Sequence, residues 1–426
     1  MSDPVVLTRA TTLRGSVRVP GDKSTSHRAL MLSALADGES SIEGLSPGLD
    51  VAATSAILTQ LGARRRDEGL VLVEGPSEGL RPSPEALECN NSGTTMRLMA
   101  GILSGVAGDH VLTGDDSLST RPMDRVAQPL ALMGATVHGQ GPRVTAPLHI
   151  RGTSSLQGIA YHVPMASAQV KSAILLAALA ATGTTSIVED VRTRTTTETM
   201  LRDAGIEIEV TDLGAGRRVR VVAGRPRTRH WLVPGDPSQA AFFCVLATIH
   251  DDAHVKVLAI DASPERTGFI GVLQRMGSNL TSRPEGSVTT LEVQSSTLRA
   301  TEVHAHEIPS VDEVPVLVVA AAAAEGVSAF RGMGELRLKE SDRFEGSMTL
   351  ASLLGCRVWS EDDDFFVEGL SSARAFREFS VDAALDHRMV MAGAVAATAG
   401  HGGAVRGAET VSSSYPQFFD DVASLQ

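Results

Sequence analysis

The chain has 426 residues, 42% of them hydrophobic and 21% charged. This composition is typical of a globular protein, and the length indicates more than one domain. A formal net charge of −12 argues against a general affinity for nucleic acid or for an anionic membrane surface. The three cysteines are far apart, and no apolar run approaches the ~20 residues that a transmembrane helix needs. The sequence therefore predicts a cytoplasmic protein.

Six segments follow one pattern, in which a polar start leads into a helix rich in Ala, Leu and Val, then a glycine turn and a short strand. They begin at residues 21, 90, 164, 234, 309 and 386. Five of them continue into a second helix that ends at a glycine before another strand, as a glycine C-cap would. These glycines are Gly62, Gly134, Gly205, Gly277 and Gly355. The pattern predicts six repeats of strand, helix, strand, helix, strand.

The first helix of each repeat is apolar on nearly every side. Residues 173–181 (AILLAALAA) and 314–324 (VPVLVVAAAAA) carry no polar stripe, which is typical of a helix that is buried all round. Small side chains let several such helices pack closely, so we expect these helices inside and the sheets outside. The predicted fold class is therefore α/β, with six βαβαβ-type repeats whose helices are inside and whose sheets are outside.

The first polar start, residues 21–28 (GDKSTSHR), contains a lysine, an arginine, a histidine and three hydroxyl groups. Cations are unfavourable at a helix N-terminus unless an anion binds there. Further cations lie at other starts, or in loops after the second strand of a repeat: Arg97, Arg121, Arg125, Lys171, Arg192, Arg194, Lys339, Arg343, His387 and Arg388. Several such starts facing one cleft would bind a polyanion. The fifth start offers Asp312 and Glu313 instead, which would suit proton transfer.

Simpler interpretations stay open for individual residues. A capping role alone would explain Asp312, and a solvated helix face with i,i+4 ion pairs would explain residues 339–343. His304 and His306 alternate on a strand-like run without a third ligand at a suitable spacing, so no metal site is predicted. Residues 21–24 lack the GxxxxGK[ST] spacing of a P-loop.

Seven motifs occur in an order that is similar to a known family: GDKSTSHR, NNSGTTMRL, STRPMDR, SAQVKSA, GDPSQAAFF, LRLKESDR and DHRM. Over essentially its whole length, the chain resembles the 5-enolpyruvylshikimate-3-phosphate synthases, or 3-phosphoshikimate 1-carboxyvinyltransferases, of the enolpyruvyl transferase family. The resemblance implies a two-domain inside-out α/β barrel with three repeats in each domain. One domain would span residues 21–233, the other residues 1–20 plus 234–426, with hinges near 20–21 and 234–235.

The resemblance also implies a reaction. The enolpyruvyl group of phosphoenolpyruvate would pass to the 5-hydroxyl of shikimate 3-phosphate, with release of phosphate. Addition and elimination would proceed through a tetrahedral intermediate in the cleft between the domains. This is a step in the biosynthesis of chorismate and the aromatic amino acids, and the target of glyphosate. The implied protein is a monomer whose partners are these two small-molecule substrates, with no cofactor, metal, nucleic acid or membrane.

Roles for single residues follow from the resemblance, position by position. Asp312 would take the proton of the hydroxyl, Glu340 would protonate the methylene carbon, and Lys23 would stabilise and shuttle charge. The residues implied to bind shikimate 3-phosphate are Lys23, Ser24, Arg28, Ser167, Ala168, Gln169, Arg194, Asp312 and Lys339. Those implied to bind phosphoenolpyruvate are Lys23, Gly93, Arg121, Gln169, Arg343 and Arg388.

Two positions depart from the family pattern, because Ala168 replaces a serine and Ser413 stands where many relatives have a lysine. The nearest alternative is the sister transferase that acts on UDP-N-acetylglucosamine. It usually has a cysteine in the loop that is LSTRPMDR here, and a Lys-Asn pair in place of Lys23-Ser24. A catalytically inactive phosphometabolite sensor is disfavoured because the three proposed catalytic residues are all present. The acidic net charge disfavours a nucleic-acid 3′-phosphate cyclase.

Overall fold

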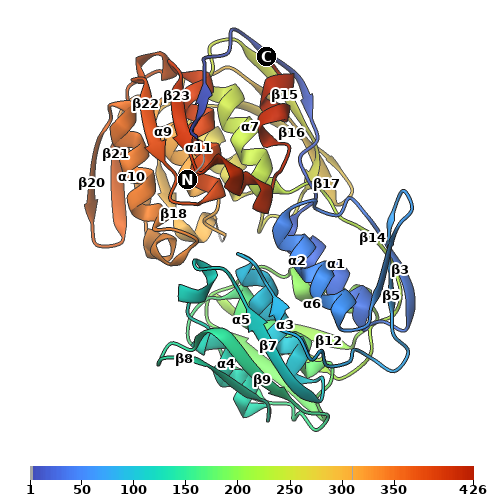
Figure 1. The fold of residues 1–426 in the computed structure, drawn as a ribbon. Helices are drawn as coiled ribbons and strands as arrows, with labels where there is room; N and C mark the ends of the chain where they lie inside the picture. Colours follow the sequence, from blue (N-terminus) through green and yellow to red (C-terminus); the bar gives the residue numbers. More distant parts are fainter. Residues whose placement is uncertain (1–2, 309) are drawn as a thin grey trace. The chain divides into compact units, whose positions relative to one another are not determined.

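A computed structural model describes residues 3–308 and 310–426. The chain forms two compact units (Figure 1). Unit 1 consists of Met1–Asp22 and Pro234–Gln426, and unit 2 of Lys23–Val233. Each unit contains three repeats. No helix among the described residues is long and apolar enough to cross a membrane.

Three buried helices form the inside of unit 2: α1 (Lys23–Leu35), α3 (Gly93–Ser104) and α5 (Ala168–Ala178). Most of their residues are buried on every side, as their apolar sequences predict. A glycine allows α3 and α5 to approach closely, since a Cβ atom at Gly101 would lie 2.3 Å from the carbonyl oxygen of Ala173. Three outer helices complete the repeats: α2 (Leu49–Gln60), α4 (Asp124–Leu132) and α6 (Thr196–Asp203).

Three four-stranded sheets belong to unit 2. The first has the order β14 (His230–Leu232), β3 (Gly38–Glu43), β5 (Val71–Gly75), β4 (Arg64–Asp67). The second has the order β6 (Leu87–Glu88), β7 (Gly108–Thr113), β9 (Thr145–Gly152), β8 (Thr136–Gln140). The third has the order β10 (Ala160–His162), β11 (Thr184–Glu189), β13 (Gly216–Val222), β12 (Ile208–Leu213).

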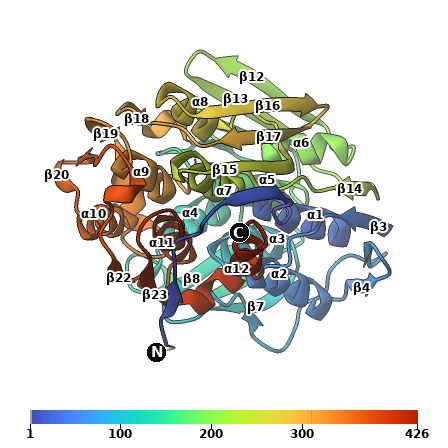
Figure 2. The ribbon, with the colours of Figure 1, turned by 90° about the horizontal axis from the view of Figure 1, so that it is seen from above.

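Unit 1 has the same plan, with inner helices α7 (Pro237–Ile249), α9 (Val314–Ala322) and α11 (His387–Ala399). Figure 2 shows these helices with strands on their outer side. One sheet runs β16 (Asn279–Glu285), β17 (Val288–Gln294), β15 (Ala253–Asp261), β2 (Leu13–Val17). Another runs β18 (Glu302–His304), β19 (Val327–Arg331), β21 (Asp364–Glu368), β20 (Arg357–Glu361). The third has three strands, β1 (Val5–Leu7), β23 (Gly403–Arg406), β22 (Phe379–Asp382). The outer helices are α8 (Gly268–Arg275) and α10 (Arg343–Leu354), and α12 (Phe418–Ser424) lies near the end of the chain.

The observed repeat has one strand more than the predicted one. In the third repeat β10 and β11 pair in parallel around α5, and after α6 the chain forms an antiparallel hairpin of β12 and β13. The sequence pattern merged this hairpin into one strand, because its turn is short and lies between two β-branched runs. In the first repeat the outermost strand, β14, comes from the other end of the unit and pairs in parallel with β3. The inside-out arrangement itself is confirmed.

The five glycines predicted to end the second helices all have positive φ: Gly62, Gly134, Gly205, Gly277 and Gly355. Their φ values lie between 79° and 107°, in the left-handed region that favours glycine. Each of these five repeats therefore turns from its outer helix into its hairpin at the position that the sequence marks.

Candidate active site

The second turn of α1 is tied to two other helices of unit 2 through Arg28. Its Nη2 donates to Ser172 Oγ of α5 at 2.8 Å, and its Nε donates to Thr197 Oγ1 of α6 at 2.6 Å. Its Nη1 donates to the backbone oxygen of Ser24 at 2.8 Å. Arg28 is buried, so these contacts fix the guanidinium group firmly.

The first residues of α1 also have polar partners. The Lys23 ammonium group lies 2.9 Å from Asp50 Oδ2, in the first turn of α2. Arg194, in the loop before α6, donates to Ser24 Oγ at 3.4 Å. Lys23, Ser24 and Arg194 therefore lie together at this end of unit 2, and Asp50 balances the charge of Lys23. Asp50 was not among the predicted site residues.

The start of α5 lies beside the start of α3. Ser167 is the N-cap of α5, whose helix begins at Ala168. Gln169 donates to Thr94 Oγ1 at 3.0 Å and accepts from Arg97 Nη1 at 2.8 Å. Together with the contacts of Arg28, this brings the N-terminal turns of all three inner helices to one end of unit 2, where free backbone N–H groups favour anions.

Gly93 opens α3 next to two arginines. A Cβ atom at Gly93 would lie 2.8 Å from Arg97 Nη1 and 3.4 Å from Arg121 Nη1. Arg121 in turn donates from Nη2 to Asn91 Oδ1 at 2.7 Å and to Ser117 Oγ at 3.1 Å. The absence of a side chain at Gly93 therefore leaves room for both guanidinium groups at this helix start.

In unit 1, Arg343 is the centre of a cluster of acidic side chains. Its Nε and Nη2 donate to the two carboxylate oxygens of Asp386, at 2.7 and 3.2 Å. Its Nη1 lies 2.8 Å from Asp312 Oδ1, and its Nη2 lies 2.6 Å from Glu340 Oε2. Burial opposes the charge of Arg343, but these three carboxylates hold its pKa above the usual value. One guanidinium group thus positions both of the carboxylates predicted to transfer protons.

Asp312 is surrounded by positive charge. Burial acts to raise the pKa of this carboxyl group, but three cations outweigh burial and hold its pKa well below its usual range: Arg388, Lys339 and Arg343. Lys339 also lies 2.6 Å from Glu335 Oε1. Asp312 is therefore ionised at neutral pH, as a proton acceptor must be.

Three arginines have buried donor atoms without a hydrogen-bond partner among the described residues. Arg266 is one of them, through its Nε, and its Nη2 lies in a buried network of carboxylates. The other two are predicted to bind phosphoenolpyruvate: Arg388 of unit 1, through Nε and Nη1, and Arg121 of unit 2, through Nε. Arg388 opens α11 beside Asp386, which accepts its backbone N–H at 2.8 Å, and its guanidinium carbon lies 5.8 Å from the Phe242 ring centroid. Buried donors normally have partners, so these atoms are suited to an anionic ligand.

Lys171, a cation of the third helix start, has partners within the protein instead. It is buried, and its Nζ lies 3.1 Å from Glu189 Oε1 and 2.6 Å from Glu198 Oε1. Arg217 contacts the same Glu189, which also accepts from Thr193 Oγ1 at 2.7 Å. Burial alone would raise the pKa of Glu189, but Lys171 and the hydrogen bonds lower it. This network holds the loop that carries Arg194.

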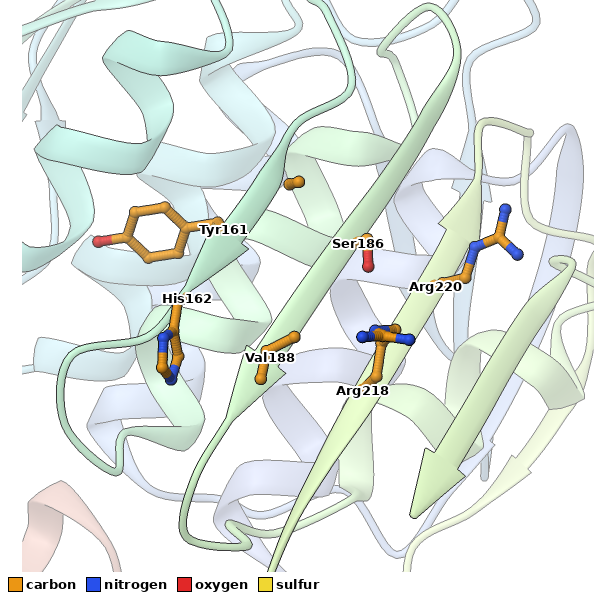
Figure 3. A pocket seen from close by; sticks show the side chains of 7 residues that line it. Tyr161, His162, Ser186, Val188, Arg218 and Arg220 are labelled. Carbon is orange, nitrogen blue, oxygen red and sulfur yellow. The ribbon is translucent and has the colours of Figure 1, made fainter. Parts of the chain in front are cut away.

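A hollow of about 500 Å³ lies elsewhere in unit 2, on the outer face of the sheet of β10 to β13 (Figure 3). It is lined by Tyr161, His162, Ser186, Arg218 and Arg220, among others. None of the predicted site residues lines it. Among the described residues no group of three or more His, Cys, Asp or Glu side chains is arranged to hold a metal ion.

The sequence alone missed several acidic residues that hold the cations, among them Asp50, Asp386 and Glu189. Asp386 carried the clearest signal, because it precedes His387 and Arg388 at a helix start, where aspartate is a favoured cap. Asp50 lies 27 residues from Lys23 along the chain, and Glu189 lies 18 residues from Lys171. No local sequence pattern links residues that far apart.

Residues 7–422 match the family described as EPSP synthase (3-phosphoshikimate 1-carboxyvinyltransferase). The chain belongs to the EPSP synthase family. A 3-phosphoshikimate 1-carboxyvinyltransferase of Synechococcus sp. (strain JA-3-3Ab) is 42% identical, over 100% of this chain and 97% of the relative. The enzyme of the same name from Lactococcus lactis subsp. lactis (strain IL1403) is 39% identical, over 97% of each.

Solved structures agree with this assignment. An EPSP synthase from Acinetobacter baumannii superposes with a TM-score of 0.87 at 36% identity, over 100% of this chain and 98% of the other. The enolpyruvyl transferase NikO from Streptomyces tendae has a TM-score of 0.78 at 18% identity, over 100% and 98%, and shows the shared fold alone. As a member of the EPSP synthase family the chain is a transferase of aromatic biosynthesis, which passes the enolpyruvyl group of phosphoenolpyruvate to shikimate 3-phosphate. The family and reaction predicted from the sequence are confirmed.

The buried network of Lys171 generates a stability prediction. We expect Lys171→Met to lower the free energy of unfolding by about 3–5 kcal/mol, because it leaves Glu189 and Glu198 buried with less positive charge. The melting temperature of the variant measures this loss. Lys256→Met is the matched control, since the exposed Lys256 lies 3.8 Å from its partner Glu292 and should change stability by less than about 0.5 kcal/mol. Equal melting temperatures for the two variants would contradict the role of the network.

Proposed function

We propose that two groups of residues, one in each unit, carry out the family reaction in this chain. In unit 2, shikimate 3-phosphate is bound by the ends of α1 and α5 and by the loop before α6: Lys23, Ser24, Arg28, Ser167, Ala168, Gln169 and Arg194. Asp312 and Lys339 of unit 1 contact the same substrate. Phosphoenolpyruvate is bound by Lys23, Gly93, Arg121, Gln169, Arg343 and Arg388.

The observation that carries this proposal is the set of contacts around Arg343. Asp312 and Glu340 both contact this guanidinium group, at 2.8 and 2.6 Å, so a base and an acid lie on either side of one fixed cation. Arg388 also lowers the pKa of Asp312, and two of its buried donor atoms have no hydrogen-bond partner in the described part of the chain. Such a cluster suits a reaction in which a hydroxyl group loses a proton while an anionic enol phosphate gains one.

The addition step follows from these positions. The 5-hydroxyl oxygen of shikimate 3-phosphate bonds to C2 of phosphoenolpyruvate while Asp312 takes the hydroxyl proton. The electron pair of the C2–C3 double bond takes a proton from Glu340, which turns the methylene group into a methyl group. In the elimination step the C2–O bond to phosphate breaks, Asp312 gives its proton to the departing phosphate, and Glu340 takes back a proton from the methyl group, so that both side chains return to their starting states. Lys23 stabilises the negative charge of the substrates.

Glu340 must be protonated to act as the acid, and Arg343 opposes this because a nearby cation favours the carboxylate. The phosphate and carboxylate groups of the substrates offset that positive charge when they bind. Glu340 therefore acts as the acid only when the substrates are bound.

The activity itself is tested by the acceptor that supports phosphate release from phosphoenolpyruvate. We expect release with shikimate 3-phosphate and none with UDP-N-acetylglucosamine, because the chain has Lys23-Ser24 and no cysteine in residues 118–125. Release with the nucleotide sugar alone would assign the chain to the sister activity. Binding of shikimate 3-phosphate without turnover would identify a sensor.

Glu340→Gln separates chemistry from binding. We expect the variant to lower kcat at least about 100-fold, since Gln cannot protonate carbon, while both KM values change less than about threefold. Steady-state kinetics measures both quantities. Glu345→Gln is the control, because Glu345 is exposed on α10 and should keep the wild-type kcat. Wild-type turnover in Glu340→Gln would reject Glu340 as the acid.

Gly93→Ala tests the binding of phosphoenolpyruvate. The added methyl group would lie 2.8 Å from the end of the Arg97 side chain, which must shift, and would contact Arg121 at 3.4 Å. We expect the KM for phosphoenolpyruvate to rise about tenfold, with little change in the KM for shikimate 3-phosphate. Gly271→Ala is the control, since its Cβ would meet only Arg275 at 4.0 Å. An equal rise in both KM values would count against the assignment of Gly93.

A further inference from the structure

The turn that carries Asp312 has an unusual backbone conformation. Val311, the residue before it, has a φ of 50°, in the left-handed region that β-branched residues rarely adopt. Such conformations persist only where neighbouring contacts hold them, and they concentrate at functional sites. The position of Asp312 therefore depends on whatever fixes the turn on both sides of it.

Glu313, the next residue, makes these contacts. Its side chain is buried, and its Oε2 accepts from Ser310 Oγ at 2.7 Å. This hydrogen bond spans Val311 and Asp312 and closes the turn. The backbone oxygen of Ser310 also accepts from Lys339 Nζ at 3.4 Å, so the turn meets a second residue proposed to bind substrate.

The other oxygen of Glu313 fixes the turn to the rest of unit 1. Oε1 accepts a hydrogen bond from Ser238 Oγ, in the first turn of α7. Ser238 Oγ in turn accepts from Arg266 Nη2 at 3.1 Å. Both oxygens of this buried carboxylate are thus occupied within the protein, which leaves Glu313 no direct role toward a ligand.

Arg266 supplies the positive charge that a buried carboxylate requires. It is buried, and its Nη2 also lies 2.8 Å from Asp22 Oδ2 and 2.7 Å from Asp236 Oδ1. Burial opposes the charge of Arg266, but Asp22, Asp236 and Glu313 hold its pKa above the usual value. A continuous chain of buried polar contacts therefore runs from Asp22, which directly precedes Lys23, to the turn of Asp312.

We propose that Glu313 is a positioning residue for enolpyruvyl transfer: held by Ser310, Ser238 and Arg266, its carboxylate fixes the strained turn that presents Asp312 to the substrate hydroxyl. The proposal rests on the function proposed above for Asp312. Glu313 contacts neither substrate, and its effect on the reaction passes through the orientation of its neighbour.

Three single variants and one double variant test this role in the full chain with both substrates. We expect Glu313→Ala to lower kcat about 100-fold and Glu313→Gln, which keeps the volume and one acceptor, about tenfold. Ser310→Ala should also lower kcat. The double variant Ser310→Ala/Glu313→Ala should be no slower than Glu313→Ala, because both substitutions remove the same hydrogen bond between Ser310 and Glu313. The KM for phosphoenolpyruvate should change less than about threefold, since Asp386 pairs with the guanidinium group of Arg343 and caps the helix that carries Arg388.

Melting temperatures and a matched control separate positioning from folding. Glu325→Gln changes an exposed glutamate just beyond the other end of α9 and should keep the wild-type kcat. If Glu313→Ala does not fold, Glu313→Gln and Ser310→Ala carry the same comparison. A kcat within twofold of wild type for the folded Glu313 variants would overturn the proposal, as would additive effects of Ser310→Ala and Glu313→Ala or equal rises in both KM values. A wild-type chain without activity on shikimate 3-phosphate would instead refute the proposed function.

Discussion

The ion pair of Arg343 and Asp386 is the contact on which the proposed site of unit 1 depends. Both side chains are fully buried, and two hydrogen bonds join them. Asp386 also caps α11 through the backbone of Arg388 and accepts from Ser341. Because removal of one member of a buried pair leaves an uncompensated charge, this contact fixes the segments on either side of it. The remaining donors of Arg343 then place Asp312 and Glu340 before any substrate arrives, which is the preorganisation that electrostatic catalysis requires.

The same construction recurs in unit 2 with other residues. Lys171 is held by two buried glutamates, and the neighbours of that network, Ser172 and Thr197, hold Arg28. The six repeats thus share helix starts that gather charge, but the charges divide into two kinds. Some cations are neutralised by carboxylates of the protein and stabilise the fold. Others, such as Arg121 and Arg388, keep unpaired buried donors among the described residues and are suited to ligands. The repeated helix starts explain why charged side chains lie at these positions. The neighbouring side chains determine whether each cation is paired within the protein or is suited to a ligand.

Much of the fold could be predicted from the sequence, because its signals are local. Apolar runs such as residues 314–324 predict inner helices, and glycines such as Gly134 mark where outer helices end. The hairpin of β12 and β13 was missed because a tight turn between two β-branched runs resembles a single strand. Site residues were predicted through family motifs, whereas the carboxylates that hold them, such as Asp50 and Glu189, lie far along the chain from their partners. Pairs of that kind depend on tertiary packing, which no local pattern encodes.

The buried donors of Arg388 that are unpaired within the described chain support a binding role for this side chain. Stability alone favours pairing a buried donor, as at Lys171, or replacing the pair by apolar side chains at little cost. Nε and Nη1 of Arg388 are buried beside an ionised Asp312 and yet lack hydrogen bonds within the described chain. Local rules of this kind are typically broken where function requires it. These unpaired donors therefore support the anion binding proposed for Arg388, in a chain whose net charge of −12 disfavours a general attraction for anions.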